Sequence, residues 1–253
     1  YGRNGESPLP VLAASSPANC FYFAYQACRI ALERMTPAIL MTDVFLANGS
    51  APFRIPDMEE YDPINPPFAG ENEENYQPYR RDEKTYARKW AIPGTAGLEH
   101  RIGGLEKMDV TGNVSYVPEN HELMTEYRQK KVEQVIDYVP DLKVKGPEKG
   151  KLLVIGWGGT YGHIANAVRL LRNRGHDDIT HAHFNYIRPL PQNTYEILSG
   201  FEKIIVCEMN NGQFSKYLEH KHQEFTYLTY NKVQGTPFTV SELIEEFTKI
   251  LEG

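Results

Sequence analysis

A glycine-bounded segment places an acid, a base and a cation side by side. Glu99, His100 and Arg101 lie within GLEHRIGGLE, which covers residues 97–106. A carboxylate beside an imidazole can act as an acid–base pair, because each group stabilises the charged form of the other. A loop held together by an internal ion pair is an equally good interpretation. We therefore treat these three residues as candidates for facing a ligand or a partner.

Two histidines, His181 and His183, are separated by one residue in a segment that predicts a strand, so their side chains share a face. They could form half of a metal site. No third ligand is close in sequence, which favours a structural or interface role. His220 and His222 have the same spacing in a predicted helix, where two side chains diverge. We expect no metal site.

Amide side chains follow another predicted strand. Asn210 and Gln213 come directly after the apolar run 203–207, in CEMNNGQ. Ligands of parallel α/β proteins gather at the carboxyl ends of strands, so either amide could contact a ligand or a partner. Capping of the next helix is the structural alternative, and both interpretations stay open.

The sequence GWGGTYG (156–162) joins a predicted strand to a predicted helix. Glycines there let the backbone approach a phosphate, and a helix N-terminus favours an anion. The spacing differs from the GxGxxG of dinucleotide-binding proteins, and no P-loop lysine is present. A tight packing turn is favoured, while contact with an anionic ligand stays open.

The three cysteines, Cys20, Cys28 and Cys207, lie in apolar stretches without any CxxC pair. We expect small buried side chains rather than ligands of a cluster or a zinc ion. Such cysteine usage fits a reducing cytoplasm.

The N-terminal elements that must position these groups follow a βαβ pattern. LPVLAA (9–14) predicts a buried strand, and Ser16 followed by Pro17 predicts the start of a helix. The run AILMT (38–42) predicts a central parallel strand, because it is apolar on both faces. Between them, apolar residues recur at helical spacing at Phe21, Ala24, Cys28, Ala31, Leu32 and Met35.

Residues 49–97 are rich in proline, asparagine, glutamate and tyrosine, and predict a long irregular arm. Its aromatic side chains lead us to expect that residues 49–110 lie against a partner subunit; an arm that wraps its own domain is the alternative. A helical pattern begins at Pro118 and ends before Pro140. The charged segment 140–150 predicts a linker between two domains.

The remaining residues, 151–253, predict an independent domain. Strands are expected near 151–155, 180–187, 203–207 and 225–230, and helices near 161–174, 193–200, 211–221 and 239–252. Alternating strands and helices predict a parallel sheet covered on both faces.

The composition excludes several protein classes. The 253 residues are 41% hydrophobic and 24% charged, as in ordinary globular proteins. A net charge of -6 argues against a nucleic-acid or membrane-surface face. No apolar run approaches the roughly 18 residues that span a bilayer, and no signal segment is evident. We expect no nucleic-acid or membrane partner.

Three stretches carry a family resemblance. Residues 1–57, YGRNGESPLP through FRIPD, resemble the later part of the pyrimidine-binding domain in alpha subunits of 2-oxoacid:ferredoxin oxidoreductases. IPGTAGLEHRIGGLEKMDVTGNVSYVPENHELM resembles the connector of the 2-oxoglutarate branch. LLVIGWGGTYGHIANAVRLLR, FNYIRPLPQN and IIVCEMNNGQFSKYL are similar to the family's following domain, which resembles the C-terminal domain of transketolase.

The resemblance implies an α/β fold with four parts. Residues 1–48 would be part of a thiamine pyrimidine-binding domain, and 49–139 an extended connector and helix. Residues 140–150 would be a linker, and 151–253 a transketolase C-terminal-like parallel α/β domain.

The family decarboxylates a 2-oxoacid with coenzyme A, giving an acyl-CoA and reduced ferredoxin. The resemblance therefore implies thiamine diphosphate with Mg shared with a beta subunit, an iron–sulfur cluster in that subunit, and coenzyme A as co-substrate. It also implies ferredoxin as a partner, a dimer of alpha–beta pairs and a cytoplasmic location. In the family, the carboxylate for the thiamine ring and a Thr-containing substrate motif precede the position of Tyr1. We therefore expect the chain alone to be inactive and to hold no metal cluster.

One site residue comes from the resemblance. Arg3 matches an arginine in the family's GRxGE loop, which implies that its guanidinium holds the substrate carboxylate. An arginine in solvent, or one paired with Glu6, is the alternative. No catalytic residue is assigned. Two alternative functions remain open: a non-catalytic module that docks a partner, and the same chemistry on pyruvate or a branched-chain 2-oxoacid.

Overall fold

The computed structural model describes residues 5–253, which divide into two compact units. One unit comprises the described residues up to Val11, Ala24–Ile39 and Arg54–Tyr138. The other comprises Leu12–Phe23, Leu40–Phe53 and Val139–Gly253. Both contain segments that are distant in sequence, so long-range contacts define each of them.

The second unit contains a five-stranded sheet in the order β3-β5-β4-β7-β8. The central strands β5, β4, β7 and β8 are parallel, and β3 is antiparallel to β5. The prediction of an α/β fold built on a parallel sheet is confirmed. The strand bounds are β3 Val144–Lys145, β4 Gly150–Trp157, β5 Ile179–Phe184, β7 Phe201–Glu208 and β8 Tyr227–Asn231.

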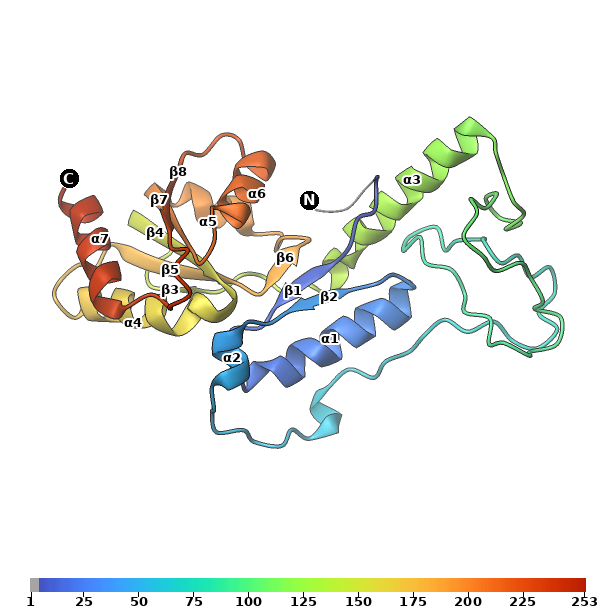
Figure 1. The fold of residues 1–253 in the computed structure, drawn as a ribbon, viewed down its shortest axis with the longest axis horizontal. Helices are drawn as coiled ribbons and strands as arrows, with labels where there is room; N and C mark the ends of the chain where they lie inside the picture. Colours follow the sequence, from blue (N-terminus) through green and yellow to red (C-terminus); the bar gives the residue numbers. More distant parts are fainter. Residues whose placement is uncertain (1–4) are drawn as a thin grey trace. The chain divides into compact units, whose positions relative to one another are not determined.

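Helices cover both faces of this sheet (Figure 1). Leu152 and Val154 of β4 pack with α4 (Tyr161–Arg172) and α7 (Val240–Glu252). The alternate residues Leu153 and Ile155 pack with α5 (Thr194–Ser199) and α6 (Gln213–Lys221). A strand buried on both faces must be apolar at every position, which explains the continuous run in β4. Each such side chain stabilises the fold by roughly 1.5–3 kcal/mol.

The predicted linker contains a strand. The charged, Gly- and Pro-containing sequence of residues 140–150 predicts a linker, and within it Val144 and Lys145 form β3 and pair with Ala182 and His181 of β5. An edge strand needs only one hydrogen-bonded neighbour and can keep charged side chains in solvent. The composition of this segment gives no signal for so short a strand.

A second, three-stranded sheet has the order β2-β1-β6. The predicted strand 180–187 splits at Asn185 into β5 and β6, and β6 joins this other sheet. The carbonyl of Asn185 accepts a hydrogen bond from Ala13 N at 2.7 Å, and its side-chain amide donates to Ala13 O at 2.7 Å. The strand bounds are β1 Val11–Ala13, β2 Ile39–Met41 and β6 Tyr186–Arg188.

The strand predicted as central, β2, lies at the edge of its sheet. Ile39 is 41% exposed and Met41 is 37% exposed. An apolar run is expected in a buried strand, so the prediction fails because the described residues leave one edge and part of a face of β2 uncovered.

Helix α1 (Asn19–Arg34) exposes much of the stripe that was predicted to be buried. Phe21 and Leu32 are about two-fifths exposed, and Cys28 is exposed as well. The buried residues are Phe23, Gln26, Ile30 and Arg34. Both sets have helical spacing, so periodicity alone could not decide which face packs inward. The helix also begins at Asn19, three residues after the predicted cap at Ser16.

The arm after α2 (Val44–Asn48) is largely irregular, as predicted, apart from the short helix η1 (Met58–Glu60). It contacts α1 of its own chain. Trp90 Nε1 donates to the carbonyl of Leu32 at 2.6 Å, and the Tyr25 hydroxyl donates to the carbonyl of Asp62 at 2.8 Å. These contacts agree with the alternative interpretation, in which the arm wraps its own domain.

The helix predicted from Pro118 is α3 (Pro118–Glu133), followed by the 3-10 helix η2 (Gln134–Tyr138). It returns the chain to α1. Asp137 forms an ion pair with Arg34 at 3.0 Å, and Tyr138 donates to Glu33 at 2.5 Å.

Candidate functional site

The glycine-rich sequence after β4 forms a tight packing turn, which contains the 3-10 helix η3 (Gly158–Thr160). A Cβ at Gly156 would lie 2.5 Å from Ile164 Cδ1 and 2.9 Å from Thr160 Oγ1, so a larger residue would force these side chains to move. The backbone N–H of Gly159 donates to the carboxylate of Asp43 at 3.1 Å. A carboxylate of the chain itself thus occupies part of the position expected for an anionic ligand.

Beside this turn lies a cavity of about 400 Å³, here called the polar cavity. Its lining side chains carry hydroxyl, amide, imidazole and ammonium groups, and none of them is a carboxylate. They are Ser15, Ser16, Asn19, Lys143, Lys145, Tyr161, His181, His183 and Asn185. All belong to the unit that contains the five-stranded sheet.

The two histidines of β5 share one face, as predicted. Their ring centroids are 5.4 Å apart, and both rings contact Tyr161. His183 Nε2 donates to the carbonyl of Gly158 at 3.1 Å. Both ring nitrogens of His181 are buried without a hydrogen-bond partner in the described residues.

Burial keeps both rings neutral. Desolvation, with smaller effects from His183 and Lys145, holds the pKa of His181 well below its ordinary value. Desolvation also lowers the pKa of His183 to about 3, although its bond to Gly158 opposes the shift. Each neutral ring therefore offers one N–H donor and one acceptor at neutral pH.

The amides after β7 are partly structural. Asn210 Oδ1 accepts from Gln213 N at 2.8 Å, which satisfies a free N–H at the start of α6. The dominant cap is Glu208, which is fully buried. Its carboxylate accepts from Phe214 N, Ser215 N and Trp157 Nε1 at 2.8, 2.9 and 3.1 Å. The role of Glu208 was not predicted from the sequence, although an acidic residue at the end of an apolar strand indicated a polar function at that position.

The segment with the acid–base motif lies in the other unit. His100 Nδ1 donates to the carbonyl of Leu98 at 2.8 Å, and its ring lies 6.1 Å from the ring of Tyr76. Glu99 and Arg101 are exposed. The imidazole is therefore oriented by backbone rather than by Glu99. Arg3 lies outside the described residues.

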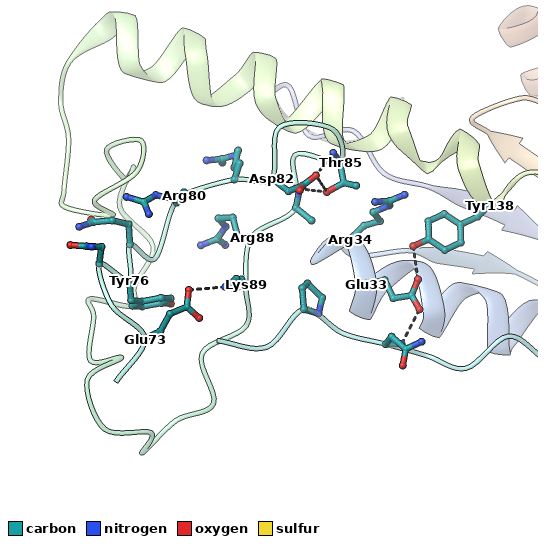
Figure 2. A pocket seen from close by; sticks show the side chains of 16 residues that line it. Glu33, Arg34, Glu73, Tyr76, Arg80, Asp82, Thr85, Arg88, Lys89 and Tyr138 are labelled. Atoms are coloured by element: carbon teal, nitrogen blue, oxygen red, sulfur yellow. Dashed lines mark hydrogen bonds and ion pairs between the residues drawn. The ribbon is translucent and has the colours of Figure 1, made fainter. Parts of the chain in front are cut away.

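Figure 2 shows a second cavity, of about 500 Å³, here called the arginine pocket. Its lining includes Arg34, Arg80, Arg81, Arg88 and Lys89. Its carboxylates already have partners inside the pocket, as the dashed lines in Figure 2 show. Glu33 accepts from Tyr138, Glu73 from Lys89, and Asp82 from Thr85.

Positive charge exceeds negative charge around this pocket. Arg88 lies 4.0 Å over the ring of Tyr79 and donates to the carbonyl of Pro78. Neither Arg80 nor Arg88 forms an ion pair with another described residue. Nearby, burial and then Arg88, Arg81 and Arg128 lower the pKa of Lys131 to about 7. This cluster was not predicted from the sequence because its residues lie in an irregular arm. Three arginines within nine residues nevertheless indicated a local concentration of positive charge.

Only one of the three cysteines is buried, although all three are predicted to be buried. Cys207 is fully buried, and desolvation raises the pKa of its thiol. Cys28 is exposed and Cys20 is partly exposed, because the side of α1 that carries them is turned outward. Within residues 5–253, no three His, Cys, Asp or Glu side chains gather as ligands for a metal ion. No helix in the same range has the length and apolar character to cross a membrane.

One protein-family model matches the N-terminal part of the chain. Residues 3–117 match the family model described as pyruvate flavodoxin/ferredoxin oxidoreductase, thiamine diphosphate-binding. The chain is 47% identical over 244 residues to the 2-oxoglutarate oxidoreductase subunit KorA of Mycobacterium tuberculosis. It is 29% identical to the alpha subunit of 2-oxoacid:ferredoxin oxidoreductase 1 of Aeropyrum pernix.

These matches cover almost the whole chain but only part of each relative. They cover 96% and 100% of the chain, and 37% and 40% of the two relatives. Among solved structures, the chain superposes with a TM-score of 0.89 and 27% identity on a 2-oxoglutarate:ferredoxin oxidoreductase from Magnetococcus marinus, solved with 2-oxoglutarate, coenzyme A and succinyl-CoA bound. That match covers 99% of this chain and 43% of the other. The chain is therefore a relative of the alpha subunits of 2-oxoacid:ferredoxin oxidoreductases, and the resemblance expected from its sequence is confirmed.

Proposed function

We propose that this chain is part of the alpha subunit of a 2-oxoglutarate:ferredoxin oxidoreductase. The complete enzyme would convert 2-oxoglutarate and coenzyme A to succinyl-CoA and carbon dioxide, with reduction of ferredoxin. The observation that carries the proposal is the 47% identity over 96% of the chain to a 2-oxoglutarate oxidoreductase subunit. A TM-score of 0.89 to an enzyme with 2-oxoglutarate and coenzyme A bound supports it independently.

The proposal makes the active site composite. Thiamine diphosphate, when bound, supplies the carbanion chemistry. The described residues gather no set of three metal-ligating side chains that would fit its magnesium ion. No step of the thiamine chemistry is therefore assigned to them. We propose that a beta subunit holds the diphosphate, the magnesium ion and an iron–sulfur cluster. We further propose that the enzyme is a dimer of alpha–beta pairs, that it reduces ferredoxin, and that it is located in the cytoplasm.

The exposed apolar side of α1 supports a contact with another part of such an assembly. Phe21, Leu32 and Cys28 lie along one side of the helix, where water would otherwise contact apolar surface. Glu99 and Arg101 are also exposed and are proposed as interface residues. The division into residues 1–48, 49–139, 140–150 and 151–253 remains a proposal. A compact unit whose last segment begins at Val139 supports a boundary near residue 140.

The test is to purify the complex from its source and to assay coenzyme A-dependent dye reduction. The assay compares 2-oxoglutarate, pyruvate and a branched-chain 2-oxoacid as substrates. We expect a preference for 2-oxoglutarate. Activity on pyruvate alone would support the alternative substrate. A stable complex without activity on any 2-oxoacid would support the docking-module alternative.

A second experiment addresses Arg3. If its guanidinium binds the substrate carboxylate, Arg3→Lys should raise the KM for 2-oxoglutarate, because lysine cannot form the two parallel hydrogen bonds. The KM for coenzyme A should stay unchanged. An unchanged KM for 2-oxoglutarate would favour an arginine in solvent or one paired with Glu6.

A further inference from the structure

We propose that the polar cavity, lined by residues of β3 and β5 and by the first residues of α1 and α4, binds the oxyanion group, a phosphate or a carboxylate, of a small organic ligand. The observation that carries this inference is a buried, unpartnered imidazole in a cavity whose lining is rich in hydrogen-bond donors. This observation does not depend on the oxidoreductase function proposed above.

His181 is the first part of the argument. Only 1% of its surface is exposed, and neither ring nitrogen has a hydrogen-bond partner in the described residues. Leaving buried polar atoms unpaired costs roughly 1–3 kcal/mol for each group. Natural proteins seldom retain such groups without a ligand or another use. Because His181 lines the cavity, a bound molecule can supply the missing partners.

The serines provide donors. The Oγ of Ser15 accepts from the side-chain amide of Asn19 at 2.8 Å, and the Oγ of Ser16 accepts from Asn19 N at 3.2 Å. The amide oxygen of Asn19 in turn accepts from both serine N–H groups at 3.0 Å. Since each hydroxyl oxygen already accepts a hydrogen bond, each hydroxyl hydrogen remains a donor. The turn thus offers two O–H donors at the cavity.

Lys145 gives the cavity its charge. Its ammonium group lies 4.6 Å over the ring of Tyr161 and donates to the hydroxyl of that residue, which leaves further N–H groups for a ligand. Lys143 also lines the cavity, and no lining residue is acidic. Donors and positive charge without a carboxylate select an acceptor-rich anion. A volume of about 400 Å³ exceeds what an isolated phosphate needs, so the anion would be one part of a larger ligand.

The test measures binding directly. Isothermal titration calorimetry on the full alpha subunit in its complex would use three probes: inorganic phosphate, coenzyme A and 2-oxoglutarate. Wild-type protein is expected to bind at least one probe in the cavity. Lys145→Met and the double variant Ser15→Ala, Ser16→Ala should weaken this binding at least tenfold. Lys149→Met is the matched control, because Lys149 is an exposed lysine of the same segment that does not line the cavity.

The probes distinguish the sources of the anion. Binding of coenzyme A that phosphate displaces would assign the cavity to a phosphate group. Binding of 2-oxoglutarate that phosphate does not displace would assign it to a carboxylate. The proposal is overturned if no probe binds, or if the cavity variants bind each probe as wild-type protein does. The second result can occur while dye reduction is normal, so failure here is distinct from failure of the proposed function.

Discussion

Asp43 and Gly159 are joined by a hydrogen bond of 3.1 Å between residues that lie 116 positions apart in the chain. The same carboxylate caps α2, because its other oxygen accepts from Leu46 N at 2.9 Å. One side chain thus fixes both the start of α2 and the turn that follows β4.

Gly159→Ala should break this arrangement. A Cβ at this position would lie 2.0 Å from Asp43 Oδ2, so the carboxylate must move and α2 loses its cap. We expect the free energy of unfolding to fall by about 1–2 kcal/mol, the cost of a lost N-cap. Urea denaturation measures the change. Gly162→Ala is the control, because Gly162 lies in α4 with open space around the position of a Cβ. This substitution should raise the free energy of unfolding by roughly 0.5–1 kcal/mol, because alanine favours the helix. Equal effects of both substitutions would contradict the argument.

Glu208→Gln should destabilise the start of α6. The buried carboxylate accepts three hydrogen bonds, and an amide turns one of its acceptor atoms into a donor that faces other donors. We expect a loss of about 2–3 kcal/mol in unfolding free energy, with faster hydrogen exchange at Phe214 and Ser215. Glu219→Gln on the exposed side of α6 should change stability by less than about 0.5 kcal/mol. Unchanged exchange in the Glu208 variant would show that the cap is dispensable.

Lys131 should make stability depend on pH in a defined window. In the folded chain, burial and neighbouring arginines lower its pKa to about 7, from the ordinary lysine value of 10.5 that applies when the chain is unfolded. Between these values the unfolded state binds the additional proton, so the free energy of unfolding rises as the pH increases from about 7 to about 10. Below and above this window the contribution is constant.

Lys131→Met should flatten that rise. The difference in unfolding free energy between wild type and variant, followed from pH 6 to pH 10, isolates the contribution of Lys131 because other titrating groups cancel. Lys130→Met, one position away with a side chain that is 39% exposed, is the control. A wild-type rise that survives in the Lys131 variant would assign the pH dependence to another group.

His181→Phe should stabilise the protein in the absence of a ligand. The substitution keeps a ring of similar size and removes two buried nitrogens that lack partners. We expect an increase of about 1–3 kcal/mol in unfolding free energy. His220→Phe, on an exposed position of α6, should have little effect. A destabilised His181 variant would indicate that the imidazole already has partners in the folded protein, such as ordered water.

The sequence predicted the elements of the C-terminal sheet well because their patterns are strong. The runs at β4 and β7 are apolar on both faces, and only a strand covered by helices on both sides satisfies such a run. Pro118 and Thr239 mark helix starts that the structure confirms, since Thr239 forms a reciprocal cap with Glu242. The shared face of His181 and His183 followed from strand geometry alone.

Tertiary structure alone decided which surfaces pack inward and which polar groups meet. Periodicity gave α1 two equivalent faces, and the buried one was fixed by residues such as Asp137 and Tyr138, more than a hundred positions away. The polar cavity likewise joins Ser15 and Asn19 to Lys145 and His181, which no local pattern relates. Local sequence specifies the conformation of a segment through short-range forces, whereas a site depends on long-range contacts that form only when the chain folds.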